Sequence, residues 1–260
     1  MINELQSRCR SIRRRIVSLA SRSGEGHVPS SLSIVELLVS VLSAIQGNGS
    51  STSSLVLSKG HASLAYYAAL EEFGFIKEDE LDSFCSFESN FGGHPDSTKH
   101  SSITFSTGSL GHGLALAAGA AYYEKNSTNS PRQIFTILGD QECNEGSVWE
   151  AALLTSTLKL GKVVALIDMN GSDSRSIPMA NLVDKWRSFN WKVIEVDGHD
   201  IGNLGFAIDQ TKDHPDSPSA LICKTVKGKG VSFMESSFEW HHKKLDQLSL
   251  TKALEELQDA

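Results

Sequence analysis

The stretch IFTILGDQECNEGSVWEAALLTSTLKLGKVVALIDMNG, residues 134–171, decides the fold. It begins with the apolar run 134–138 and reaches a second apolar run at 163–167 after residues with helical patterning. Parallel strands that are buried on both faces appear in a sequence as continuous apolar runs, and a helix usually connects them. The stretch therefore predicts a βαβ unit.

Two more apolar runs follow, at 193–196 and 220–223. The four runs begin 29, 30 and 27 residues apart. This is the spacing of successive βαβ units. We expect the second half of the chain to form a parallel sheet with helices on both faces, which makes the fold class α/β.

The first half of the chain has helical patterns and one short strand. We expect helices over 2–21, 32–45, 62–73 and 109–125, and a strand at 55–57. The N-terminus carries three successive arginines and several serines, as transit peptides do. Its apolar residues nevertheless recur at helical spacing, which favours the first helix of the fold over a targeting segment. These residues are Leu5, Cys9, Ile12, Ile16 and Leu19.

Length and composition limit the class of protein. A chain of 260 residues is long enough for one large domain over 1–260, and no change in composition marks a linker. The 24 basic and 31 acidic residues give a net charge of −7, so we expect no nucleic-acid partner. The four cysteines lack a CxxC pair, which favours a reducing compartment over a zinc site or a disulfide framework. No apolar run approaches the roughly 20 residues that span a bilayer, so we expect a cytoplasmic protein without a membrane partner.

Two candidate metal ligands stand where the first two strands of this sheet end. Asp140 comes directly after Gly139, and Asn170 follows the apolar run 163–167. In open α/β sheets ligands bind outside the carboxyl ends of the strands, and carboxylate and amide oxygens suit Mg²⁺. A diphosphate would complete the ligand shell of the metal. The alternative reading is that Asp140 caps a helix and that Asn170 belongs to a turn.

Histidines beside glycines form a second set of candidate residues. Three glycines within the six positions 108–113 would let backbone N–H groups approach a ligand. Neutral imidazoles donate hydrogen bonds to phosphate oxygens or sugar hydroxyls and titrate near neutrality. The histidines concerned are His27, His61, His94, His112 and the pair His241–His242.

Several enzyme classes lack the motif that they require. The histidines do not have HExxH spacing, which disfavours a zinc site. There is no GxxxxGK[ST] for a P-loop nucleotide hydrolase and no GxSxG for a serine hydrolase. The glycines at 108, 111 and 113 do not form GxGxxG, so a dinucleotide-binding oxidoreductase is a weak alternative.

Seven segments that run nearly from end to end of the chain point to one family. They are GHVPSSLSIVELL (26–38), LSKGHASLAYYAAL (57–70), GGHPD (92–96), STGSLGHGLALAAG (106–119), 139–171, DKWRSFNWKVIEVDGHD (184–200) and the segment 224–241 that begins KTVKGKGVSFME and ends WH. In this order and spacing they resemble the N-terminal subunit of split transketolases, which are thiamine diphosphate-dependent enzymes. The resemblance implies the diphosphate-binding domain of the thiamine diphosphate fold.

The resemblance also implies roles for individual residues. Thiamine diphosphate and Mg²⁺ are the implied cofactors, with Asp140, Asn170 and a backbone carbonyl near Ser172 as metal ligands. The implied catalytic residues are His27 and His94, which would meet the hydroxyls of a ketose donor, His241, and Glu145 and Glu150, which would relay protons at a subunit contact. The implied cofactor-binding residues are His61, Thr107, Gly108, Ser109, Leu110, Gly139, Asp140, Gln141, Asn170 and His241.

A partner subunit is part of what the resemblance implies. The family's activating glutamate and the residues that grip a substrate phosphate lie in a pyrimidine-binding domain, and this sequence stops near the end of the first domain. We therefore expect a separate pyrimidine-binding subunit, a heterotetramer, and transfer of a two-carbon ketol unit from a ketose to an aldose. Two alternatives stay open, namely thiamine-dependent transfer onto a carrier protein and a non-catalytic regulatory subunit.

The sequence departs from the family pattern beside the metal ligand. The family motif usually opens Gly-Asp-Gly, whereas Gln141 follows Asp140 here. If glycine is needed there for positive φ, glutamine would weaken cofactor binding. If glycine only provides space, Gln141 adopts ordinary negative φ and turns its side chain toward the partner or the cofactor. We favour the second explanation because the other cofactor-contacting segments are intact. The segment 171–176 and His242 also differ from the family pattern.

Overall fold

A computed structural model describes residues 2–47, 49, 54–171, 181–235, 237, 239–241 and 243–259. Its described strands form one sheet in the order β1-β2-β3-β5-β4. All neighbouring strands are parallel, as the spacing of the apolar runs predicts. The strands are Leu55–Leu57 (β1), Ile134–Gly139 (β2), Val163–Met169 (β3), Lys192–Asp197 (β4) and Ser219–Lys224 (β5).

The strands extend one or two residues beyond the predicted apolar runs. Gly139 still pairs with Asp168, and Met169 still pairs with Lys224. The sequence prediction ended β3 at residue 167 because a carboxylate interrupts the apolar run there. Asp168 therefore lies inside a central strand of the sheet.

Helices cover both faces of the sheet, as expected. One apolar cluster joins the sheet to α6 (Gly113–Ser127), α7 (Gly146–Thr157) and α8 (Leu182–Ser188). A larger cluster joins the opposite face to α3 (Val35–Gly47) and α9 (Ile201–Gln210). The fold is therefore a three-layer α/β architecture.

Alternate side chains of each strand enter the two clusters. Phe135 and Ile137 of β2 belong to the larger cluster, whereas Ile134 and Leu138 belong to the other. The same alternation continues in β3 and β5. Because both faces are buried, both sets must be apolar, which explains the continuous apolar runs in the sequence.

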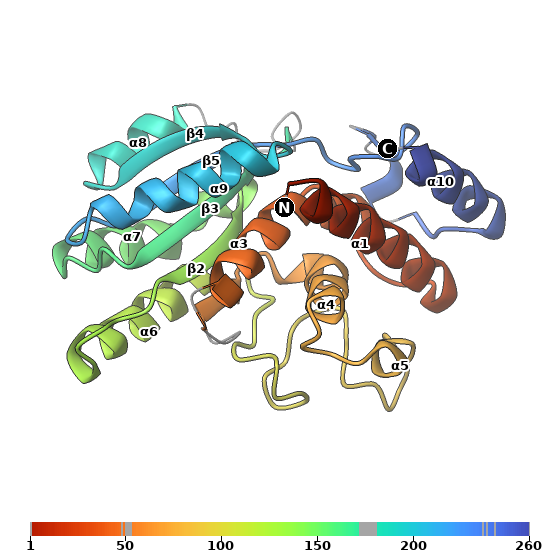
Figure 1. The fold of residues 1–260 in the computed structure, drawn as a ribbon, viewed down its shortest axis with the longest axis horizontal. Coiled ribbons are helices and arrows are strands. Elements are labelled where there is room, and N and C mark those ends of the chain that lie inside the picture. The colour runs from red at the N-terminus through yellow and green to blue at the C-terminus, as the bar shows by residue number, and fades with distance from the viewer. Residues whose placement is uncertain are drawn as a thin grey trace.

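The remaining helices gather beside the sheet at one end of the molecule (Figure 1). The first, α1 (Ile2–Ser23), packs against α3, α4 and α10 and buries most of its predicted apolar stripe. The N-terminal segment is thus the first helix of the fold. None of the described helices has both the length and the apolar character needed to cross a bilayer. The other elements at this end are α4 (Ser63–Glu72), α5 (Glu78–Leu81) and α10 (Gln247–Asp259).

Two helix boundaries differ from the prediction. The helix predicted over 32–45 begins only at Val35, as α3, and the residues before it form a separate short helix, α2 (Val28–Leu32), with proline in its first turn. The helix predicted from residue 109 begins only at Gly113. Residues 109–112, just before it, stay non-helical because Gly111 has φ +83° and donates its N–H to a side chain of another segment. The glycine loop is therefore longer than expected and reaches His112.

A buried ion pair ties the helical end to the sheet. Arg13 of α1 contacts Glu36 of α3 at 2.7 Å, and His199 Nδ1 lies 3.0 Å from the same carboxylate. The other nitrogen of His199 accepts the Val226 N–H at 2.8 Å. Burial alone would raise the pKa of Glu36, but the charge of Arg13 and the hydrogen bond to His199 outweigh it and lower this pKa to about 2.

We expect Glu36 to make folding stability depend on pH. Because its folded-state pKa lies below the ordinary 4.5, the folded protein binds fewer protons than the unfolded chain. The stabilisation is complete above about pH 4.5 and is lost as the pH falls toward 2. Urea unfolding of Glu36→Gln should show a weaker fall of unfolding free energy between pH 5 and 3 than the parent shows. Glu4→Gln, which removes an exposed carboxylate, should keep the parent's slope, and an unchanged slope in Glu36→Gln would contradict the assignment.

Candidate functional site

Asp140 and Asn170 directly follow the neighbouring strands β2 and β3, at the carboxyl edge of the sheet. The Asp140 N–H donates to the carbonyl of Asp168 at 3.2 Å, so β2 and β3 are joined up to their last residues. The Asp140 and Asn170 side chains are both mostly buried. The prediction that the two residues lie at adjacent strand ends is confirmed.

Asp168 of β3 is fully buried and forms hydrogen bonds with both of these residues. Its Oδ2 accepts hydrogen bonds from Asn170 Nδ2 at 2.8 Å and from Ser33 at 2.8 Å. The same oxygen forms an ion pair with Lys59 Nζ at 2.5 Å, while Oδ1 accepts a bond from the Thr225 hydroxyl. Asp168 therefore joins β3 to the segments that follow α2, β1 and β5.

Asp168 orients Asn170, a candidate metal ligand, and its own negative charge is balanced by Lys59. Because the nitrogen end of the Asn170 carboxamide is bonded to Asp168, the oxygen end points away from it. The Lys59 ammonium, which is 2% exposed, balances the carboxylate that burial would otherwise penalise. Burial and the neighbouring Lys59 lower the pKa of Lys227, while Asp140 and Asp168 act in the opposite direction. Lys227 is thus a further cation beside the site.

The donor set fits a divalent metal and a diphosphate. Asp140 offers a carboxylate and Asn170 a carboxamide oxygen, and Mg²⁺ prefers such hard oxygen ligands. The third predicted ligand, a carbonyl near Ser172, lies outside the described residues, as does His242. Lys227 adds positive charge near Asp140, which suits a polyanionic ligand.

The glycine loop of residues 107–113 packs tightly against its neighbours. A Cβ on Gly60 would lie 2.8 Å from the backbone nitrogen of Gly108, and a Cβ on Gly111 would lie 2.4 Å from Ser147 Oγ. Side chains at either position would push the loop away. The glycines therefore allow this loop to pack closely against neighbouring segments of the chain, and the predicted approach of its N–H groups to a ligand stays a prediction.

Three of the predicted histidines come from different elements and lie beside one another or against the glycine loop. His27, just before α2, and His61, just after β1, have ring centroids 5.3 Å apart. The His94 ring lies against Gly108, where an added Cβ would be 3.1 Å from His94 Cδ2. Ser63 and Tyr67 of α4 hold the His94 segment by hydrogen bonds to its carbonyls. The structure therefore brings His27, His61 and His94 to one end of the molecule.

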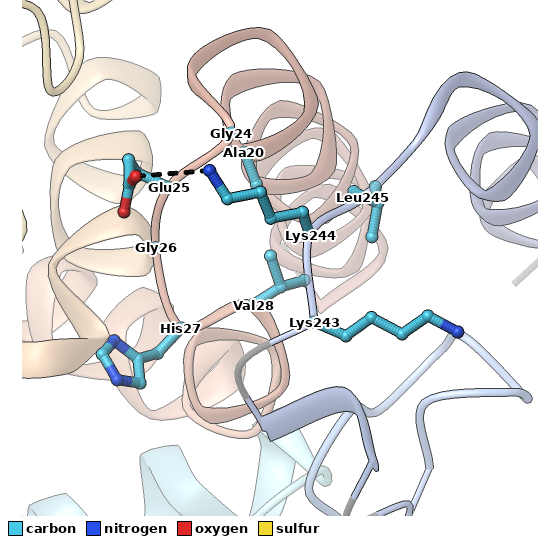
Figure 2. A pocket seen from close by; sticks show the side chains of 9 residues that line it. All are labelled: Ala20, Gly24, Glu25, Gly26, His27, Val28, Lys243, Lys244 and Leu245. Carbon is cyan, nitrogen blue, oxygen red and sulfur yellow. Dashed lines mark ion pairs between the residues drawn. The ribbon is translucent and has the colours of Figure 1, made fainter.

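The backbone of His241 reaches the same end through the C-terminal segment. His241 ends the 3₁₀ turn Glu239–His241, which contacts α2. Beyond it, Lys243–Leu245 lie against Gly24–Val28 and form a small pocket beside His27 (Figure 2). An ion pair of 3.7 Å between Lys244 and Glu25 closes one side of this pocket. The C-terminal segment is thereby fixed next to the loop that carries His27.

The remaining predicted residues lie at the start of α7 and in the glycine loop. Glu145 precedes the helix and packs beside Gly111, while Glu150 lies further along it, and both are exposed. Ser109 is exposed and Leu110 half-buried in the glycine loop. These positions are open to a neighbouring subunit.

Gln141 adopts ordinary backbone geometry. It begins a 3₁₀ turn and is absent from the non-glycine residues with positive φ. The expectation of negative φ is confirmed. Its N–H donates to the carboxylate of Asp140 at 2.8 Å, and its Oε1 accepts a bond from Asn144 at 3.2 Å. The side-chain oxygen is thus engaged within its own turn, where we expected the side chain to face the partner or the cofactor.

Sequence reasoning missed four charged residues at this edge, namely Lys59, Glu142, Asp168 and Lys227. All four lie in the motif segments, but none was singled out. The signal for Asp168 was available, because a carboxylate inside an apolar strand requires a buried partner. Nothing in the sequence identified Lys59 as that partner.

Comparisons with known proteins agree with this geometry. The family model described as "Transketolase, thiamine diphosphate binding domain" matches residues 8–257. One subunit of an apulose-4-phosphate transketolase from Actinobacillus succinogenes is 36% identical, over 99% of this chain and 97% of its own length. A 6-deoxy-6-sulfo-D-fructose transketolase subunit of a Clostridium species is 35% identical, over 98% of this chain and 96% of its own length.

Longer relatives match along part of their length. Human transketolase is 33% identical over 93% of this chain, which corresponds to 40% of the human protein. The crystal structure of Campylobacter jejuni transketolase superimposes with a TM-score of 0.87 at 25% identity, over 99% of this chain and 43% of that one. A Pichia stipitis transketolase mutant superimposes with a TM-score of 0.87 at 23% identity, which shows the shared fold.

We expect Lys59→Met to destabilise the fold by about 3 kcal/mol, because it leaves the Asp168 carboxylate buried without its counter-charge. Adding Asp168→Asn should recover part of this loss, since the carboxylate is then removed as well. Urea unfolding of the single and double variants measures both effects. Lys192→Met, at an exposed position, is the control. A cost below about 1 kcal/mol for Lys59→Met would show that the ion pair is not the hub of this edge.

Proposed function

Because the chain belongs to the transketolase thiamine diphosphate-binding family, we propose that it is the diphosphate-binding subunit of a two-subunit transketolase-like enzyme. The enzyme transfers a two-carbon ketol unit from a ketose donor to an aldose acceptor. One observation carries the proposal: Asp140 and Asn170 end neighbouring strands at the edge where the glycine loop and three histidines converge. Metal ligands, an anion cradle and proton-handling groups thus lie at one site.

Each group at the edge receives a role. Asp140 and Asn170 would hold Mg²⁺. The diphosphate would be surrounded by Thr107, Gly108, Ser109 and Leu110 of the glycine loop, with Gly139, Gln141 and His61. When bound, thiamine diphosphate supplies the carbon nucleophile that breaks and forms the carbon–carbon bond.

The chain's own contribution near the substrate comes from histidines. His27 and His94 would hold the hydroxyls of the ketose. An imidazole donates or accepts a proton near neutral pH, and a positioned general acid or base is worth on the order of 10²–10⁴-fold in rate. His94 is exposed on the surface of this chain, so a partner that covers it would also exclude water.

The site needs a second polypeptide. The chain spans about 40% of human transketolase but nearly the full length of the two subunit relatives. The pyrimidine-binding domain with its activating glutamate would then belong to a separate partner subunit. Such a partner also supplies the contacts to the substrate's terminal group.

An exposed apolar face supports assembly into a heterotetramer. Large apolar side chains that would ordinarily be buried are exposed along α6 and α7, beside an apolar groove between the two helices. Glu145 and Glu150 lie at the start of α7, where they would relay protons across the subunit contact. Permanent subunit contacts are apolar and commonly exceed about 2,000 Å². The exposed residues are Leu116, Tyr122, Tyr123, Leu153 and Leu154.

Reconstitution with the partner tests the proposal. The chain alone should transfer no ketol unit, and the chain with a pyrimidine-domain partner, thiamine diphosphate and Mg²⁺ should do so. The two subunit relatives are named for different sugars, so the donor panel includes phosphorylated and sulfonated ketoses. Transfer by the single chain would contradict the need for a partner. If the complex binds the cofactor and transfers the unit to a carrier protein but to no aldose, the carrier alternative is favoured. If it does not bind the cofactor, a regulatory subunit is favoured.

We expect Asp140→Ala and Asn170→Ala each to abolish retention of thiamine diphosphate by the reconstituted complex. Mg²⁺ demands near-ideal octahedral geometry, so the loss of either ligand removes metal and cofactor together. Calorimetric titration with thiamine diphosphate measures the affinity directly. Asp209→Ala, an exposed carboxylate on α9, should bind as the parent does. Unchanged affinity in both ligand variants would refute the metal assignment.

A further inference from the structure

Glu142 is a buried carboxylate that the proposed reaction does not use. It lies in the 3₁₀ turn Gln141–Asn144 that follows β2, and it is 2% exposed. Its Oε1 accepts hydrogen bonds from Ser58 Oγ at 2.5 Å and from the Gly111 N–H at 2.9 Å. Its Oε2 accepts the Gly139 N–H at 3.1 Å. A single carboxylate thus receives three donors.

The three donors belong to the three segments that build the cradle. Ser58 precedes the residues Lys59 to His61 after β1, Gly111 lies in the glycine loop, and Gly139 is the last residue of β2 before Asp140. Glu142 therefore joins the three predicted cofactor-binding segments by hydrogen bonds. Because it is buried, its side chain is not part of the surface that would face the ligand.

The glycine loop depends on this contact for its conformation. Gly111 has φ +83°, a region that favours glycine, and its N–H is held by Glu142. Two residues later, a Cβ on Gly113 would lie 2.3 Å from Ser58 Oγ, so the hydroxyl that bonds Glu142 also abuts the loop. The peptide plane at Gly111 is thereby fixed before α6 begins.

A buried acid beside a diphosphate site is costly in two ways. Its burial carries a desolvation penalty, and its negative charge would repel the ligand. A residue retained only for packing would avoid both costs by being neutral. The three donated bonds indicate that the carboxylate is kept for the geometry it imposes.

We propose that Glu142 is a positioning residue that holds the glycine loop against the end of β2 in the conformation that accepts the diphosphate. The inference rests on the proposed function, since it names the residue that shapes the same anion site. Glu142 acts through Gly111 and Gly139 and does not touch the cofactor.

Glu142→Gln separates positioning from simple charge repulsion. The amide keeps the size of the side chain and removes its charge, but its NH₂ group cannot accept the hydrogen bonds that one carboxylate oxygen accepts. If the carboxylate only repels the ligand, removing its charge tightens binding. If it positions the loop, the variant binds thiamine diphosphate more weakly. The direction and the size of the change in affinity decide between the two.

The measurement is a calorimetric titration of the reconstituted complex with thiamine diphosphate at fixed Mg²⁺. We expect the Kd of Glu142→Gln to rise at least fivefold, with kcat and the donor KM at saturating cofactor close to those of the parent. A rise of less than fivefold, or tighter binding, overturns the proposal. If the parent complex itself fails to bind thiamine diphosphate, the proposed function fails. If the parent complex binds it and Glu142→Gln binds it equally well, only the positioning role of Glu142 fails.

Two further variants complete the test, one as a matched control and one as a substitute if Glu142→Gln does not fold. Glu256→Gln is the matched control, because Glu256 also accepts a serine hydroxyl and a backbone N–H but lies far along the chain in α10. It should bind the cofactor as the parent does. If Glu142→Gln does not fold, Ser58→Ala decides the question, since it removes one donor and leaves the carboxylate in place. A rise in Kd of threefold or more supports positioning, and any smaller change overturns it.

Discussion

The ion pair between Asp168 and Lys59 is the contact on which the edge of the sheet depends. Asp168 is fully buried inside β3, so its charge is tolerated only because Lys59 lies 2.5 Å away and hydroxyl and amide donors satisfy its other positions. Each partner comes from a different segment. The requirement to satisfy one carboxylate therefore draws α2, the turn after β1, Asn170 and the segment after β5 to one place.

This arrangement explains why the candidate site is preorganised and yet incomplete. Contacts within the chain hold Asn170, one of the proposed metal ligands, through Asp168 and hold the glycine loop through Glu142. The outer surfaces of the glycine loop and of α7 remain exposed. An internally held site with an exposed face is consistent with the proposed second subunit, which would cover that face.

The sequence predicted the parts of this architecture that follow a period or a motif. Continuous apolar runs located the parallel strands, and the glycine and histidine motifs supplied most of the residues of the candidate site, because their residue types are constrained by backbone approach and ligand chemistry. The buried partners were not predictable in the same way. Nothing local in the sequence shows that Lys59 meets Asp168 or that Glu142 meets Gly111, because these pairings form only when distant segments pack together. The late start of α6 escaped prediction for the same reason, since a contact from Glu142 holds its approach out of the helix.

The central claim is that Asp140 and Asn170 hold the metal that binds the cofactor at this edge. A crystal of the reconstituted complex with thiamine diphosphate and Mn²⁺ in place of Mg²⁺ tests it most directly, because the anomalous signal of manganese locates the metal without prior assumptions. The account predicts one strong anomalous peak within about 2.3 Å of an oxygen of each residue, next to the diphosphate. A peak at other residues, or a diphosphate bound away from the glycine loop, would contradict it.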